Sequence, residues 1–204
     1  MFTGIVETKS KIQKVLAGPQ SFQITLEKPS YFNDLKRGDS IAVNGVCLTL
    51  ENFDQNSIEF TVAAETLHVT GWSEQKLKEM NLVNLERSMH VSDRIHGHFV
   101  LGHVDGIGKI IKKEKAGDSL VLEIELPPNY EAYVWNKGSI TLNGVSLTIN
   151  KVNGSKVEVC LIPETLRSTN LSHLNIGDGL TFEVDSMARA FVHLWKLEKE
   201  NASV

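Results

Sequence analysis

The side chains best suited to chemistry stand at one position of a repeated segment. Residues 44–49 read NGVCLT and residues 143–148 read NGVSLT, so the thiol of Cys47 corresponds to the hydroxyl of Ser146. Both groups become nucleophiles once a neighbour removes the proton. Strand alternation places each on the face of the threonine two positions later. Each copy thus predicts a small polar pair beside a glycine turn. Alternatives remain: the threonine bonds the backbone inside a barrel, and Cys47 is a buried, inert thiol.

The two copies also differ in residues that carry or transfer protons. Counted from the start of each copy, His103 occupies the position of Ile5. A histidine beside a ligand is suited to acid, base or hydrogen-bonding roles near neutral pH. The alternative is a surface histidine.

Two charged residues break the symmetry of the repeat as well. Lys137 stands where the first copy has Gly38, and Asp185 aligns with Arg87 as a reversal of charge. A lone charge on a symmetric scaffold is a candidate for function, although most such charges are simply solvated.

A metal site is not expected. His96, His98 and His103 crowd the start of the second copy, but no fourth ligand and no recurring metal spacing accompanies them.

These residues lie within a duplicated domain. Asn143 follows Asn44 by 99 positions, and the segments ETL at residues 65–67 and 164–166 match at the same spacing. A period of this length is that of a whole domain rather than of a solenoid repeat. We expect a first domain at residues 1–95, a second at 96–186 and a terminal segment at 187–204. Two similar domains form either two similar pockets or one composite pocket.

The predicted fold is all-β. Many short runs of alternating, β-branched residues are separated by Asn-Gly pairs, which are typical of two-residue hairpins. This pattern predicts two small antiparallel barrels. A helical pattern appears only at the end, where Met187, Phe191 and Leu194 recur at helical spacing. We interpret that stripe as an oligomer contact; packing on its own barrel is the alternative.

Composition excludes several classes of protein. The 204 residues carry a net charge of −4, without the clustered basic surface that non-specific nucleic-acid binding requires. No apolar run is long enough to cross a membrane, and the N-terminus lacks the features of a signal peptide. We expect a cytoplasmic protein with free thiols at Cys47 and Cys160.

Taken together, four segments resemble riboflavin synthases. They are MFTGIVE at residues 1–7, the paired NGVCLT and NGVSLT, GHFVLGHVDG at 97–106 and IPETL at 162–166, and the similarity covers the whole chain. The resemblance implies two homologous six-stranded antiparallel Greek-key barrels, a C-terminal α-helix and a homotrimer held by those helices. Lumazine synthase is a further possible partner of the protein.

The resemblance also implies a reaction. Two molecules of 6,7-dimethyl-8-ribityllumazine dismutate by transfer of a four-carbon unit, giving riboflavin and 5-amino-6-ribitylaminouracil, and no cofactor is needed. Each barrel binds one lumazine, and the active site forms between the N-terminal barrel of one subunit and the C-terminal barrel of its neighbour. Such a site holds the reacting carbons in near-attack range.

Site residues follow from the same resemblance, position by position. The first half-site is expected to contain Gly4, Ile5, Val6, Cys47, Thr49 and Thr66. The second is expected to contain Gly102, His103, Val104, Ser146, Thr148, Ile162 and Thr165. The wider substrate-binding set adds Phe2, Leu48, Thr61, Val62, Ala63, Ala64, Glu65, Lys137, Leu147, Cys160, Leu161, Pro163 and Glu164.

Six residues are expected to affect turnover. We assign proton removal and nucleophile placement to His103 and Ser146, and support of the acceptor to Cys47 and Ser40; the others are Lys137 and Asp185. One segment departs from the family: residues 71–75 are extra, and residues 78–83 replace a Gly-Asp turn that the second copy keeps at Gly177 and Asp178.

Three other functions account for parts of the sequence. A non-catalytic lumazine- or flavin-binding protein of the same fold predicts degraded polar positions in one half, whereas both copies keep theirs. A flavin oxidoreductase domain calls for a nucleotide-binding partner domain with a glycine-rich turn, which the chain lacks. A purely structural module leaves the paired polar hairpins unexplained.

Overall fold

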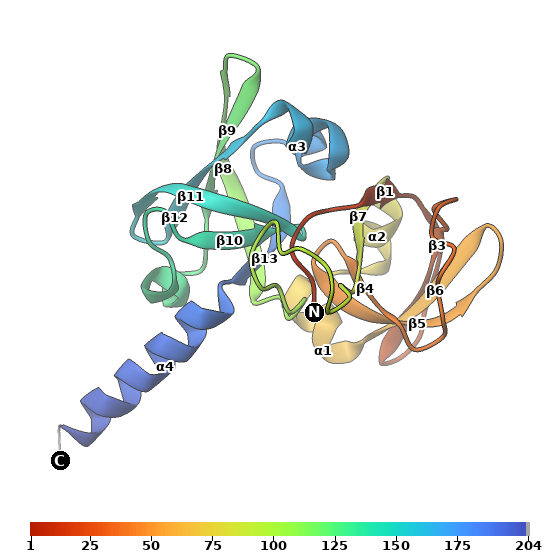
Figure 1. The fold of residues 1–204 in the computed structure, drawn as a ribbon, viewed down its shortest axis with the longest axis horizontal. Helices are drawn as coiled ribbons and strands as arrows, with labels where there is room; N and C mark the ends of the chain where they lie inside the picture. The colour runs from red at the N-terminus through yellow and green to blue at the C-terminus, as the bar shows by residue number, and fades with distance from the viewer. Residues whose placement is uncertain (203–204) are drawn as a thin grey trace.

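Strands form where the sequence alternates, and each copy folds into its own antiparallel sheet. The computed structural model describes residues 1–202, with the two barrels side by side and a helix projecting from the second (Figure 1). The first copy contains, in chain order, β1 (Thr8–Ser10), β2 (Ile12–Ala17), β3 (Ser21–Glu27), β4 (Ser40–Val43), β5 (Val46–Phe53), β6 (Ser57–Ala63), α1 (Ala64–Thr70), α2 (Glu74–Glu79) and β7 (Val83–Arg87).

The second copy repeats this order. Its elements are β8 (Gly106–Ala116), β9 (Ser119–Glu125), the 3-10 helix η1 (Pro128–Tyr133), β10 (Ser139–Leu142), β11 (Val145–Asn153), β12 (Lys156–Leu161), α3 (Pro163–Ser168), the 3-10 helix η2 (Asn170–His173) and β13 (Gly179–Val184). The terminal helix α4 (Ser186–Asn201) follows directly.

Strand order confirms the predicted barrels. The second sheet closes in the order β10-β11-β12-β9-β8-β13. Three consecutive strands (β10, β11 and β12) with β9 returned beside them make a Greek key. The first sheet has the order β1-β7-β4-β5-β6-β3-β2, in which β1 and β2 together correspond to the single long strand β8. Each barrel encloses its own apolar core, filled from alternate positions of its strands.

The barrels meet where the two Asn-Gly turns face each other. A Cβ atom added to Gly45 would lie 2.7 Å from the backbone nitrogen of Gly144, and the converse contact is equally short. Buried asparagines surround this point. Asn170 donates its side-chain amide to Asn44 Oδ1 at 2.9 Å, and its backbone N–H donates to Asn84 Oδ1 at 2.8 Å. Hydrogen bonds between the copies therefore stabilise this interface between the two barrels, which we call the seam.

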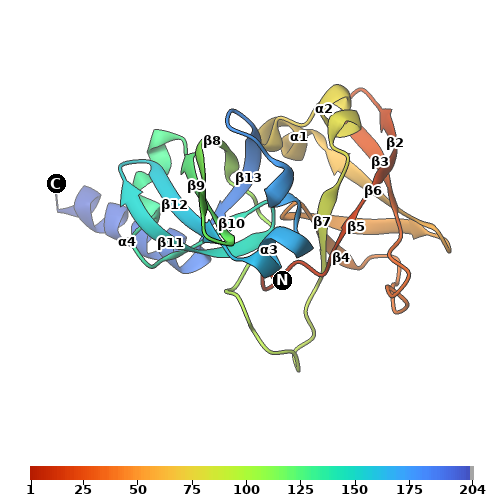
Figure 2. The ribbon, with the colours of Figure 1, turned by 90° about the horizontal axis from the view of Figure 1, so that it is seen from above.

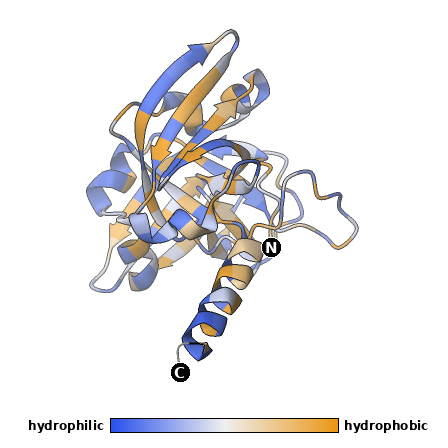
Figure 3. Ribbon diagram, turned by 90° about the vertical axis from the view of Figure 1, so that its left-hand side faces the viewer, coloured by the Kyte–Doolittle hydropathy of each residue, from blue (hydrophilic) through white to orange (hydrophobic). Residues whose placement is uncertain are grey.

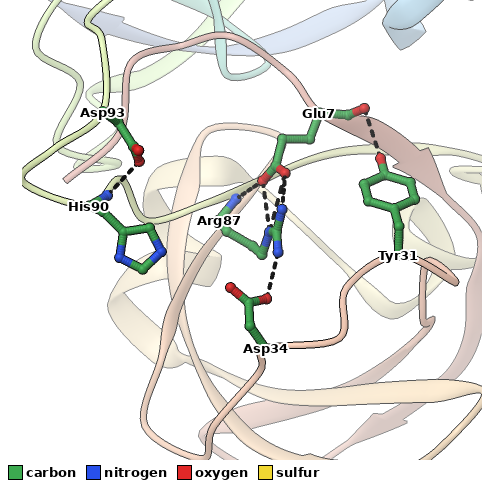
Figure 4. Close-up of polar contacts among 6 residues, drawn as sticks. All are labelled: Glu7, Tyr31, Asp34, Arg87, His90 and Asp93. Atoms are coloured by element: carbon green, nitrogen blue, oxygen red, sulfur yellow. Dashed lines mark hydrogen bonds and ion pairs between the residues drawn. The ribbon is translucent and has the colours of Figure 1, made fainter.

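An acidic residue near the start of each copy anchors the last strand of its barrel. Glu7 accepts from the backbone and guanidinium of Arg87, which also pairs with Asp34 at 2.5 Å (Figure 4). In the second copy Asp105 accepts from the backbone of Val184, and the guanidinium comes from Arg189 in α4. An ion pair thus ties the terminal helix to the second barrel.

This comparison corrects one expectation from the alignment. Ile41 pairs with Arg87, and its counterpart Ile140 pairs with Val184. Arg87 therefore corresponds to Val184, and the expected reversal of charge between Arg87 and Asp185 is wrong. The expected correspondence was wrong because α2 adds residues to the first copy, so the number of positions between equivalent residues changes along the chain.

Helix α4 leaves the body of the protein. Among its described residues only Ala188 is buried, whereas Phe191 and Leu194 are 65% and 61% exposed. Figure 3 shows apolar residues along the part of the helix nearest the barrels. The helix begins with Asp185 Oδ1 accepting from the Met187 N–H at 2.8 Å. Within residues 1–202, no helix has the length and apolar character to span a membrane.

The contact between the turns predicts a difference between two glycine substitutions. Gly45 and Gly154 both follow asparagine in hairpins and both have positive φ, +80° and +61°. A Cβ at Gly154 meets nothing within 4 Å, whereas at Gly45 it collides with backbone. We expect Gly154→Ala to cost about 1 kcal/mol and Gly45→Ala about 3 kcal/mol in urea unfolding. Equal losses would show that the close approach contributes nothing.

Candidate functional site

The N-terminal segment of each copy lies against the hairpin of the other copy. Ser146 N–H donates to the carbonyl of Gly4 at 2.7 Å, and Cys47 N–H donates to the carbonyl of Gly102 at 2.9 Å. Val6 packs on the core of the second barrel and Val104 on the core of the first. Within the chain, Gly4, Ile5 and Val6 therefore lie with Ser146, and Gly102, His103 and Val104 lie with Cys47. These contacts differ from the expected half-site groupings, and the residues that line each half-site stay a prediction.

Only glycine fits at the two positions, here called crossing points, where the N-terminal segment of one copy passes over the hairpin of the other. Gly4 and Gly102 have φ values of +75° and +77°. A Cβ on either would come within 2.6 Å of the Cβ of Ser146 or Cys47, respectively. The chain therefore brings its backbone into contact with the hairpins, beside the very positions at which the copies differ.

Two buried glutamates hold the crossing segments. Glu86 on β7 accepts from the backbone N–H groups of Thr3 and Gly4 at 2.7 and 3.0 Å. Glu183 on β13 accepts from Leu101 and Gly102, both at 2.9 Å. Burial raises the pKa of both carboxyl groups, and the backbone donors oppose that rise. The sequence analysis missed this pair, although a lone glutamate near the end of the last apolar strand of each copy was its signal.

Ser146 has a histidine partner. His98 Nδ1 lies 2.7 Å from Ser146 Oγ, and its Nε2 lies 3.3 Å from Thr141 Oγ1. Burial lowers the pKa of His98, while the charge of Asp185 opposes that effect. A neutral imidazole between two hydroxyl groups is able to accept the proton of one of them. Ser146 and His98 thus form a pair in which the imidazole is placed to accept the hydroxyl proton.

His103 does not take this place. Its side chain is exposed, and it follows Gly102 on the Cys47 side of the seam. Among the described residues no hydrogen bond joins His103 to Ser146. His103 therefore lies beside the Cys47 hairpin within the chain, and the role expected for it in turnover stays a prediction. The sequence pointed to His98 only as one of three histidines that do not form a zinc site. Its contact with Ser146 is visible only in the tertiary structure.

Cys47 has an apolar neighbourhood. It packs on a small cluster of Phe2, Ala42 and Val100 between the barrels. Phe2 is fully buried, and its backbone pairs with Val100 in an antiparallel bridge. Phe2 therefore supports the Gly102 crossing rather than offering an open surface. Ser40 pairs with Thr49 across β4 and β5, at the other end of the hairpin from the turn.

The remaining predicted residues divide by orientation. Leu48, Val62, Leu147 and Leu161 belong to the barrel cores, so their side chains face away from the surface. Thr61 donates to Glu51. Cys160 and Thr165 are half-buried, and Ile5 and Ile162 are 46% and 56% exposed. Helices α1 and α3 begin beside these strand ends, with Ala64, Glu65 and Thr66 in α1 and Pro163, Glu164 and Thr165 in α3.

Lys137 sits in an unusual backbone conformation. Its φ is +68°, in the left-handed region where its counterpart is Gly38. A lysine there costs conformational energy, which is common at functional positions. Its side chain is exposed, and its N–H donates to the carbonyl of Ile149 at 2.8 Å.

A polar hollow of about 490 Å³ adjoins the Gly4 segment. Its walls include Ile5, Ser40, Arg87, Arg94 and His96. Within residues 1–202 there is no group of three or more histidine, cysteine or acidic residues that could hold a metal ion.

Comparison with known proteins assigns the family. The lumazine binding domain family matches twice, at residues 3–88 and 101–185. The riboflavin synthase of Actinobacillus pleuropneumoniae is 37% identical over 98% of this chain and 91% of its own length. That of Mycobacterium tuberculosis is 39% identical over 93% of this chain and 95% of its own. That of Bacillus subtilis is 35% identical over 98% and 93%.

Solved structures share the fold at lower identity. LumP in complex with riboflavin superposes with a TM-score of 0.82, and LumP with 6,7-dimethyl-8-(1'-D-ribityl) lumazine with 0.80. Both are 22% identical and cover 90% of this chain and 99% of their own. With two lumazine binding domains and relatives above 30% identity along almost its full length, this chain belongs to the riboflavin synthase family, the transferases of riboflavin biosynthesis.

Proposed function

We propose that the protein dismutates two molecules of 6,7-dimethyl-8-ribityllumazine by four-carbon transfer, giving riboflavin and 5-amino-6-ribitylaminouracil. The observation that carries this proposal is the pair of crossed half-sites, each built from a glycine segment and a polar hairpin. Two identical ligands call for two similar sites. Holding them face to face supplies much of the rate enhancement, because it replaces a bimolecular encounter by a fixed geometry.

The differences between the half-sites divide the chemistry. Neutral His98 holds Ser146, so this half-site has a hydroxyl whose proton the imidazole is able to accept. We infer that this pair assists proton removal from the 7-methyl group, or placement of the nucleophile, on the lumazine bound beside Gly4. Cys47 and Ser40 support the other ligand, with His103 beside it. Lys137 and Asp185 complete the set of residues proposed to affect turnover.

The rival is a lumazine- or flavin-binding protein without catalysis. LumP is described in complex with lumazine, riboflavin and flavin mononucleotide. It is 22% identical to this chain, whereas the three riboflavin synthases named above are 35–39% identical. The hydrogen bond between Ser146 and His98 favours catalysis, because binding alone does not require a base beside a hydroxyl.

The free thiols agree with the cytoplasmic location predicted from the sequence, which cell fractionation would test. Association with lumazine synthase is also proposed, since that enzyme would deliver the substrate; co-sedimentation of the two purified proteins would test it.

The decisive assay supplies the purified protein with the lumazine alone. We expect riboflavin to appear by absorbance and fluorescence, with two lumazines consumed for each flavin formed and no added cofactor. The ratio follows from the exchange of one four-carbon unit between identical molecules. Tight binding of lumazine without any riboflavin would identify the non-catalytic rival instead.

Substitutions test the proposed roles of Ser146 and His98. We expect Ser146→Ala and His98→Gln each to lower kcat by about 10²-fold with little change in KM, as for loss of a general base. Burial lowers the pKa of His98, so it stays neutral at pH 7 and the acid limb of kcat should fall below pH 6.5. His68→Gln, exposed on α1, is the matched control. Unchanged turnover in both site variants, or an acid limb above pH 6.5, would remove His98 from the mechanism.

The proposed assembly is a homotrimer held by α4. The active site then forms between the first barrel of one protomer and the second barrel of its neighbour. Support comes from the exposed apolar stripe of Met187, Phe191, Leu194 and Leu197. We expect a sedimentation mass of three chains, reduced to one by Leu194→Glu, which places a charge in that stripe. Lys196→Glu changes the charge of an exposed residue on the opposite face of the helix and should leave the trimer intact; a monomeric parent protein would contradict the proposal.

A further inference from the structure

A second cavity lies at the seam, apart from the half-sites. It occupies about 600 Å³ between the α1–α2 region of the first copy and the segment leading into β13 of the second, which face each other in Figure 2. None of the residues proposed to bind lumazine lines it. A volume of this size accommodates a small organic ligand.

The floor of this seam pocket contains a poorly satisfied donor. Asn44 is 3% exposed, and its Nδ2 has one partner, the sulfur of Met80 at 4.0 Å. Sulfur is a weak acceptor, and a buried donor without a good acceptor is costly. The counterpart Asn143 donates its Nδ2 to Asn170 Oδ1 at 3.2 Å. Each amide nitrogen has one partner among the described residues, but that of Asn44 is a weakly accepting sulfur, so the Asn44 amide can still donate to a ligand acceptor.

The pocket walls are largely apolar. Trp72, Met80 and Leu82 face it from the first barrel, and Ile107, Leu174 and Leu180 face it from the second. Charged residues at the pocket include Lys76, Glu79 and Asp178. Because both signs are present and Lys76 already donates to the carbonyl of Gly71 at 3.0 Å, the charges favour neither anions nor cations.

The departure from the family pattern supplies one wall of the seam pocket. Helix α2 and Met80 stand where the second copy has the Gly177–Asp178 turn. Met80 and Trp72 therefore come from the segment that is specific to the first copy, and they form the wall around the Asn44 amide. A mainly apolar space that borders the weakly satisfied Asn44 amide suits an aromatic ring that carries a carbonyl.

We propose that the seam pocket binds an uncharged aromatic molecule of one or two rings, whose carbonyl accepts from Asn44 Nδ2. The ligand contacts both barrels, so its occupancy stabilises their mutual arrangement by mass action. This inference is independent of the proposed reaction, because the pocket shares no residue with the proposed lumazine sites.

Oxindole is a suitable probe, because it has two fused rings and one carbonyl. The full-length ¹⁵N-labelled protein is titrated while the indole N–H signal of Trp72 is followed by NMR. Trp135→Phe and Trp195→Phe assign that signal by elimination. We expect a saturable shift that excess riboflavin does not reduce. Indole, which lacks the carbonyl, should bind about fivefold more weakly, as expected for loss of one hydrogen bond.

Two variants locate the site. Met80→Trp should fill the seam pocket and abolish the oxindole shift, whereas Ile176→Trp, at an exposed position outside the lining, should leave it unchanged. The proposal is overturned if the Trp72 signal does not move at about 10 mM oxindole, if riboflavin abolishes the shift, or if Met80→Trp responds like the parent. Equal affinity for indole and oxindole would overturn the role of Asn44. The oxindole titration, the riboflavin competition and the comparison with indole all use the parent protein, so they test the proposal even if Met80→Trp fails to fold.

Discussion

The close approach of the two Asn-Gly turns is the constraint on which the rest of the molecule depends. Gly45 and Gly144 touch through their backbones, and a methyl group on either would force the barrels apart. At this spacing the N-terminal segment of each copy reaches the hairpin of the other, where Gly4 and Gly102 accept hydrogen bonds from Ser146 and Cys47. Two half-sites therefore arise from one contact between turns.

Duplication supplies the scaffold, and small departures from symmetry supply the chemistry. Glu86 and Glu183 perform the same task in both copies, since each holds a crossing segment by its backbone N–H groups. Ser146 alone is paired with an imidazole, that of His98. The proposed reaction of two identical molecules calls for two similar sites with unequal chemistry, which an internally repeated chain is able to provide.

The same principle explains two other asymmetries. Arg189 of α4 takes the role in the second barrel that Arg87 plays in the first, so the anchor of a barrel strand also directs a helix away from the body. Helix α2 lengthens the first copy, supplies a wall of the seam pocket and shifts the numerical correspondence between the copies. An inserted helix and an exchanged ion-pair partner thus distinguish the two copies while each barrel keeps its own apolar core.

The sequence by itself determined the duplication, the barrels, the hairpin turns and the residues that differ between copies, because alternation, turn chemistry and repetition are local properties. It also indicated the family, because four characteristic segments occur together in one chain. Tertiary structure decided the partners. Ser146 meets His98 and Gly4, while His103 goes to the side of Cys47. Residue spacing within one copy does not predict which residues of the other copy it contacts. Those contacts depend on how one barrel packs against the other.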